Sequence, residues 1–306
     1  MCIRDRPTRF LTGFFLAGVY PPAMKMIATW FRDRRGLAIG TVVGALTVGK
    51  ATPYLLKVFP ELSLPWVVGG ASVAALLGGG LVLLGYRDGP FPFRRAPFSW
   101  RLAARVVGHR ETRLAIFGYL GHMWELYAMW TWVPAFLLAS ASASGLVGEG
   151  DHRSGIVDLA SYGAIAAGGA GCIWGGWAAD RMGRERVVNL AMWVSGACSL
   201  VVGLFFGWSF WVLVPVTLVW GFFVVADSAQ FSAIVTEVAP QEGVGTALTL
   251  QTSMGFLLTM VTIQALPSIT EILGWPWTFP ILALGPAVGI AAIRRLRIRR
   301  EGAVES

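Results

Sequence analysis

Ionisable side chains interrupt several long apolar runs of this 306-residue chain. His122 and Glu125 lie three residues apart in GHMWELYAMWTW, inside an apolar run from Leu114 to Leu138. In a helix this spacing puts both side chains on one face. A carboxyl and an imidazole group can each gain and lose a proton, so the pair predicts a proton-exchanging site in a polar cavity. The alternative is a fixed pair, with each other or with a lysine, that only packs helices.

Further polar side chains lie inside other apolar runs. Asp227 lies near the middle of the run 209–236, three residues before Gln230, and Lys50 lies deep in the run 36–58. Arg9 begins the first run, where a place at the membrane interface is the alternative. Ionisable groups within a membrane are candidates for substrate and ion pathways. The candidate substrate and proton site therefore comprises Arg9, Lys50, His122, Glu125, Asp227 and Gln230.

Enzyme chemistry is not indicated by these residues. His122 and Glu125 form at most half of a metal site, and the sequence shows no cluster of further ligands. The run GALTVGK at 44–50 spells most of a phosphate-binding loop, but Ala51 stands where that loop needs a hydroxyl for magnesium. We therefore expect no enzyme, no metal and no cofactor.

Membrane-spanning helices are the elements that must position the candidate residues. Hydrophobic residues make up 55% of the chain and charged residues 14%, whereas a soluble domain has about a quarter charged. Nine apolar runs approach the ~20 residues that cross a bilayer as a helix. They are 9–31, 36–58, 65–86, 114–139, 155–179, 187–207, 209–236, 243–267 and 274–293. The predicted fold is an all-α polytopic membrane protein.

The net charge of +8 follows the predicted topology. Arginines concentrate in the segments 32–35, 87–113 and 180–186 and at the C-terminal end, and the intervening connections hold almost none. By the positive-inside rule, the arginine-rich segments and the C-terminus are expected to be cytoplasmic. The connection 237–243 should lie on the same side but has no Lys or Arg. This placement argues against a nucleic-acid partner.

The segment GWAADRMGRER at 176–186 resembles the loop motif of the major facilitator superfamily, Gly-x-x-x-Asp-Arg-x-Gly-Arg. The matching positions are Gly176, Asp180, Arg181, Gly183, Arg184 and, beyond the motif, the basic Arg186. Gly183 permits the left-handed turn that ends a helix. Asp180 is placed to interact with the N-terminus of the second span through charge–dipole attraction. Such a contact would act as a conformational latch.

Two further segments resemble this family. Arg9-x-x-x-Gly13 is similar to the basic motif of its fourth helix, and the glycine-rich run at 36–53 is similar to its fifth helix. Lys50 departs from the family's antiporter signature, so the transport direction stays open. The resemblance implies twelve helices in two halves, of which nine are present and the first three are missing. The first six residues, MCIRDR, resemble translated sequencing-adaptor DNA.

The resemblance also implies a division of the chain. The expected parts are an adaptor-like segment at 1–6, a partial N-terminal bundle at 7–86, a basic cytoplasmic connector at 87–113, a C-terminal six-helix bundle at 114–295 and a cytoplasmic tail at 296–306.

The implied function is that of a secondary active transporter in the cell (inner) membrane, working as a monomer by alternating access. Arg9 or Lys50 would hold an anionic group, which favours a small organic or inorganic anion as substrate. Glu125, His122 and Asp227 would carry protons or bind polar groups. The expected partners are the substrate, protons and the lipid bilayer. An intramembrane enzyme and a non-transporting sensor or scaffold of the same fold are the alternatives.

The missing helices give a direct test at the level of DNA. The genomic sequence upstream of the codon for residue 7 is expected to encode three more spans. Sequencing that region checks the expectation, and an upstream region without such spans contradicts it.

Overall fold

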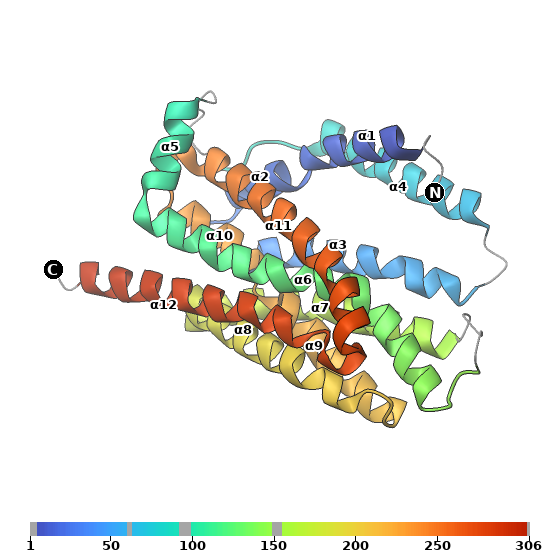
Figure 1. Cartoon of the computed structure of the whole chain (residues 1–306). Helices are drawn as coiled ribbons and strands as arrows, with labels where there is room; N and C mark the ends of the chain where they lie inside the picture. The colour runs from blue at the N-terminus through green and yellow to red at the C-terminus, as the bar shows by residue number, and fades with distance from the viewer. Residues whose placement is uncertain (1–4, 60–62, 92–98, 149–154, 305–306) are drawn as a thin grey trace.

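The computed structural model describes residues 5–59, 63–91, 99–148 and 155–304. Within these ranges every element of regular structure is helical, and nine helical segments are long and apolar enough to cross a membrane (Figure 1). These nine segments coincide with the nine predicted spans to within a few residues at most ends, so the predicted all-α polytopic fold is confirmed.

The α-helices follow one another along the chain with short connections. They are α1 (Asp5–Ala17), α2 (Tyr20–Trp30), α3 (Arg35–Lys57), α4 (Leu64–Gly85), α5 (Trp100–Gly108), α6 (Arg110–Ala143), α7 (Gly155–Met182), α8 (Arg184–Val201), α9 (Phe210–Ala226), α10 (Ser228–Val238), α11 (Val244–Leu273) and α12 (Leu284–Val304). Four 3₁₀ turns lie between them, at Val202–Phe205, Gln241–Gly243, Trp275–Trp277 and Pro280–Ala283.

Two predicted spans are interrupted in the structure. The first breaks between α1 and α2, just before Pro21 and Pro22, which have no backbone N–H to continue a helix. The seventh breaks between α9 and α10 at Asp227. Beside this second break, the thiol of Cys172 donates to the carbonyl of Val225 over 3.4 Å. The breaks matter because of the polar side chains beside them. Tyr20 follows the first break and lines an interior cavity, and Asp227 stands at the second break and is buried.

The segment expected as a cytoplasmic tail is helical through Val304. α12 continues from the last span through Val304, and residues 305–306 lie outside the described part. Arg297 Nε lies 2.8 Å from Glu301 Oε1, four residues away, and such pairs support an exposed helix. The described part of the expected tail at 296–306 thus continues the helix of the last span, and its place on the cytoplasmic side stays a prediction.

The basic connector also contains a helix. The Ser99 hydroxyl accepts from the backbone N–H of Leu102 and caps the N-terminus of α5. Leu102 and Val106 are buried, whereas Arg101 and Arg105 are exposed. α5 is thus a short amphipathic helix, and the residues 92–98 before it lie outside the described part.

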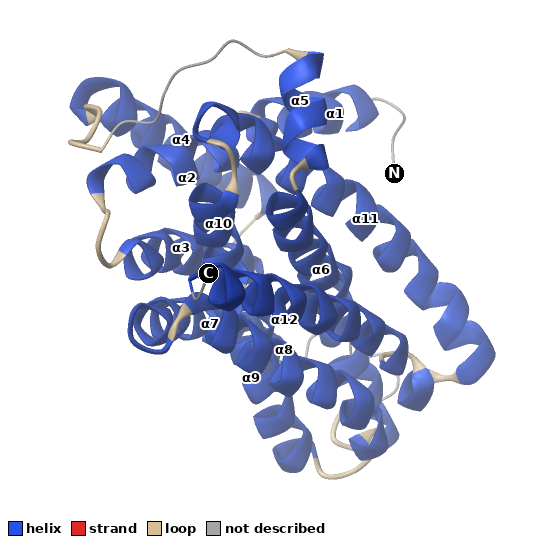
Figure 2. Ribbon diagram, turned by 90° about the vertical axis from the view of Figure 1, so that its left-hand side faces the viewer, coloured by secondary structure: helices blue, strands red, loops and turns tan. Residues whose placement is uncertain are grey.

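Glycines allow α7 to contact α3 and α9 backbone to backbone. Along α3, Gly36, Gly40 and Gly44 face α7 at Gly176, Cys172 and Gly169. On its other side, α7 meets α9, where a Cβ added at Gly221 would collide with the carbonyl oxygen of Ala164. Figure 2 shows α3, α7 and α9 following one another along one side of the bundle. Small residues at helix contacts are the usual means of close packing in membranes.

α1 and α4 form the sparsely covered edge of the molecule. Both lie away from α8, α9 and α12 (Figure 1). The helix α4 is exposed along nearly its whole length, with Leu84 92% exposed. A helix that is apolar all round and exposed in this way suits contact with lipid.

Replacing Gly221 with alanine is expected to destabilise the protein. The new methyl group would overlap the Ala164 carbonyl and force α9 away from α7, at a cost of about 1–3 kcal/mol. Thermal unfolding in detergent measures the effect as a lower unfolding temperature.

Gly79→Ala in α4 is the matched control. Nothing lies within 4 Å of a Cβ at Gly79, and alanine is the better helix former, so this variant should be neutral or slightly more stable. Equal unfolding temperatures for the two variants would contradict the role of close packing.

Candidate functional site

Glu125 is held by two neutral donors in the interior of the bundle. It lies on α6 with 1% of its surface exposed. Its Oε1 accepts from the indole Nε1–H of Trp220 over 2.7 Å, and its Oε2 accepts from the hydroxyl of Ser195 over 2.8 Å. Neither donor carries charge, and no lysine or arginine in the described part pairs with Glu125. A carboxylate in such a setting is costly unless it is protonated or gains a partner.

Two tryptophans on α6, on either side of Glu125, attach the helix to neighbouring backbone. The indole N–H of Trp132 donates to the carbonyl of Ile263 over 3.0 Å. That carbonyl is free because its usual helical partner is Pro267, which has no N–H. The indole N–H of Trp124 donates to the carbonyl of Ile281 over 3.1 Å. These two bonds hold α6 so that Glu125 faces α8 and α9.

His122 and Asp227 form a second buried pair. Nδ1 of His122 lies 2.9 Å from Oδ1 of Asp227, and both side chains are almost fully buried. The rings of Tyr119 and Phe231 flank the imidazole, with centroids 5.9 and 5.4 Å away. Nε2 of His122 has no hydrogen-bond partner in the described part. The sequence predicted that His122 and Glu125 share a face, and the structure adds a different partner for each.

A small cavity is lined by neighbours of these residues in the sequence, among them Met123, Leu126 and Ser228. Its volume is about 20 Å³, enough for roughly one water molecule. Its walls come from α2, α3, α6, α9, α10 and α11. The first five of these helices belong to the predicted spans 9–31, 36–58, 114–139 and 209–236.

Tyrosines at this cavity were not among the predicted site residues. Tyr20 reaches it from the start of α2, just after the first helix break, and Tyr119 and Tyr127 reach it from α6. Tyr119 and Tyr127 are eight residues apart, so they share a helix face. That spacing inside an apolar run was the signal that could have found them. Ser195 and Trp220 gave no such signal, because a lone serine or tryptophan is common in a span.

The remaining candidates lie elsewhere. Lys50 is exposed on α3 and has no ion-pair partner in the described part. Arg9 belongs to α1, but its side chain is outside the described residues. Gln230 is buried, and its Oε1 accepts from Nη1 of Arg184 over 3.1 Å, which places it with the motif residues rather than with Glu125.

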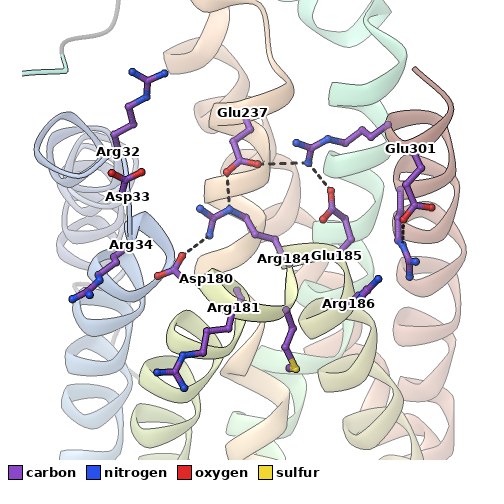
Figure 3. A pocket seen from close by; sticks show the side chains of 15 residues that line it. Arg32, Asp33, Arg34, Asp180, Arg181, Arg184, Glu185, Arg186, Glu237 and Glu301 are labelled. Carbon is purple, nitrogen blue, oxygen red and sulfur yellow. Dashed lines mark hydrogen bonds and ion pairs between the residues drawn. The ribbon is translucent and has the colours of Figure 1, made fainter. Parts of the chain in front are cut away.

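The motif residues gather where α7 ends and α8 begins. Oδ2 of Asp180 accepts from the backbone N–H of Leu37 over 3.3 Å, in the first turn of α3. Oδ1 of Asp180 lies 3.4 Å from Nη1 of Arg184 (Figure 3). Gly183 has a φ of +90° and a ψ of 143°, a backbone conformation that favours glycine but lies outside the αL region that the sequence predicted. The contact of Asp180 with the N-terminus of the second span is therefore present.

Arg184 extends this cluster to α10 and α12. Its Nε lies 2.7 Å from Oε1 of Glu237, and Nη1 of Arg300 bridges Glu237 and Glu185 at 3.5 and 2.5 Å (Figure 3). The sequence did not predict the roles of Glu237, Glu185 and Arg300. At the start of the connection 237–243, the carboxylate of Glu237 faces arginines from two other helices.

Arg181 belongs to the motif but not to the cluster. Its guanidinium lies over the ring of Trp177, 4.0 Å from the centroid, and points away from the Asp180–Arg184 pair (Figure 3). This is a cation–π contact. The motif residues and their partners line an open cavity of about 970 Å³ on the arginine-rich face, meaning the side that carries the segments 32–35 and 180–186 and the end of α12.

Comparison with known proteins shows a matching family and a related transporter. Residues 151–305 match the family described as the Major Facilitator Superfamily. The MFS-type transporter pytF of Aspergillus terreus is 25% identical over 179 residues, which cover 57% of this chain and 56% of the relative. The chain thus spans about half the length of this relative.

Replacing Asp180 with asparagine should loosen the contact between α3 and α7. A hydrogen bond to a charged group contributes about 1.5–3 kcal/mol. The fraction of molecules in which α3 and α7 have separated should therefore rise roughly tenfold or more. Cys172 is a natural reporter, because it lies buried between these helices. With Cys2 and Cys198 replaced by serine, maleimide should label Cys172 correspondingly faster in Asp180→Asn than in the parent protein.

Asp33→Asn is the matched control. Asp33 lines the same cavity but makes no ion pair or side-chain hydrogen bond in the described part of the chain. Labelling should stay at the parent rate in this variant. A parent-like rate in Asp180→Asn would show that Asp180 does not hold the helices together.

Proposed function

The chain belongs to the Major Facilitator Superfamily, and from this premise we propose that it is a proton-coupled secondary active transporter of a small solute. Membership makes it a multi-pass membrane transporter rather than an enzyme. Proton coupling, the solute and the mechanism below are our proposal. The observation that carries it is the burial of Glu125 between Trp220 and Ser195 without a cation in the described part.

The partners of Glu125 suit both protonation states. Trp220 can only donate, and it satisfies Oε1 whether or not the other oxygen carries a proton. The Ser195 hydroxyl donates to an ionised Oε2, and it can instead accept from a protonated one. In that second arrangement the hydroxyl proton has another acceptor, the Met192 carbonyl at 3.4 Å. Glu125 can therefore change its charge without leaving a buried polar group unpaired.

Burial links this change of charge to a change of conformation. An ionised carboxylate with only neutral partners is costly in the interior and less costly where water reaches it. Opening of the bundle at Glu125 would favour release of the proton, and closure would favour the protonated form. This alternation is what coupling to a proton gradient requires.

The His122–Asp227 pair would respond to the same movement. Asp227 stands at the N-terminus of α10, where the helix dipole favours a negative charge, and at a break in a span. Broken helices are a frequent means by which transporters build sites near the midplane. Any shift of α10 against α6 would alter the 2.9 Å pair with His122.

The latch residues would control access from the arginine-rich face. We place the connector between the two halves at 87–113, with 7–86 on one side and 114–295 on the other. The contact of Asp180 with Leu37 then joins the two halves, and its rupture would open the arginine-rich face. We propose that this face is cytoplasmic in the cell (inner) membrane, that the protein is a monomer, and that nucleic acid is not a partner.

A small organic or inorganic anion is the proposed class of solute. Lys50 supports it, because this cation is exposed on α3 and has no acidic partner in the described part. Arg9 is the second proposed cation. Gln230, which bonds Arg184, would act with the latch rather than with the solute.

The experiment uses the full-length protein, with any upstream spans, in liposomes loaded with a pH-sensitive dye. Small anions are supplied one at a time under an imposed pH gradient. Glu125→Gln keeps the shape and can keep both hydrogen bonds, but it cannot ionise. Accumulation of the anion that the parent transports should fall to that of protein-free liposomes, whereas exchange of internal for external anion should persist.

Glu271→Gln is the control, because Glu271 is an exposed carboxylate on α11 with no hydrogen bond or ion pair in the described part. It should accumulate the anion like the parent. Parent-like accumulation by Glu125→Gln would remove Glu125 from the proton pathway. A parent protein that moves none of the anions would favour the sensor or scaffold alternative.

A further inference from the structure

A second basic cavity lies between the start of α6 and the end of α12. Its volume is about 520 Å³, and four arginines line it: Arg110, Arg113, Arg295 and Arg299. The arginines of each helix are three or four residues apart, so each pair shares a helix face. α6 begins and α12 ends on the arginine-rich face, and the four guanidinium groups therefore meet at the level of the membrane surface.

These arginines differ from those of the latch. None of the four has an ion pair with an acidic residue in the described part of the chain, whereas Arg184 and Arg300 are both paired. Glu111 is close to the first pair in sequence, but it does not line the cavity. The cavity thus carries a concentrated positive charge without a counterion of its own. An anion is the ligand that such a charge would attract.

Apolar side chains form the rest of the wall. Phe117 lies one helical turn deeper than Arg113 and is 46% exposed, and Ile298 lies between the arginines of α12 and is 68% exposed. A free anion such as phosphate would gain nothing from these surfaces. A phospholipid would use both parts, because its phosphate binds arginine and its acyl chain covers apolar side chains.

We propose that this cavity binds one anionic phospholipid from the leaflet at the arginine-rich face. The four arginines hold its phosphate, and the acyl chain runs past Phe117 and Ile298. The adjacent residue Arg300 bonds Glu185 and Glu237, so the lipid also holds the end of α12 in place for the latch.

The test measures lipid retained by the purified protein. Native mass spectrometry counts bound dioleoylphosphatidylglycerol and, in parallel, dioleoylphosphatidylcholine. The double variant R113Q/R299Q removes one arginine from each helix. The parent should retain one phosphatidylglycerol per chain and no phosphatidylcholine, and the double variant should bind phosphatidylglycerol roughly tenfold or more weakly.

R87Q/R101Q is the control, with the same loss of charge at two exposed arginines outside the cavity. It should retain lipid like the parent. Circular dichroism and size-exclusion chromatography confirm that both variants stay folded.

Equal retention by the two double variants would overturn the proposal, and so would equal binding of phosphatidylcholine. Displacement of the lipid by an equal concentration of inorganic phosphate would show a site for free anions instead.

Discussion

Both polar sites depend on the close approach of α3 and α9 to α7. Gly176 lets the first turn of α3 lie against α7, and this places Leu37 within reach of Asp180. On the other side, Gly221 meets α7 directly, and its neighbour Trp220 is thereby directed toward Glu125. Because lipid is as apolar as the helices, the hydrophobic effect does not drive them together there. Their contact depends on van der Waals packing, which small residues permit.

The two sites handle charge differently. At the arginine-rich face, acids and arginines from α7, α8, α10 and α12 compensate one another near water, where each pair contributes little but the network is easily broken and remade. In the core, Glu125 has only neutral donors, so an ionised Glu125 costs more free energy than the charges of the surface network. A weak surface network and a costly interior charge would suit the alternation between conformations that we propose.

Local patterns in the sequence gave the spans and the motif. The nine apolar runs, the turn at Gly183 and the contact of Asp180 with a helix N-terminus follow from hydropathy, glycine stereochemistry and charge–dipole attraction. The breaks were less accessible. Two consecutive prolines indicate the break between α1 and α2, but no residue around Asp227 indicates the break between α9 and α10.

By itself, the sequence determined that His122, Glu125 and Asp227 lie within apolar segments long enough to span a membrane. Only the tertiary structure decided their partners. Ser195 and Trp220 are 70 and 95 residues from Glu125 along the chain, and Asp227 is 105 residues from His122. Helix periodicity fixes which side chains share a face, but not which helix that face meets. That choice is made by the packing of α6, α8 and α9 against one another, which no short stretch of sequence encodes.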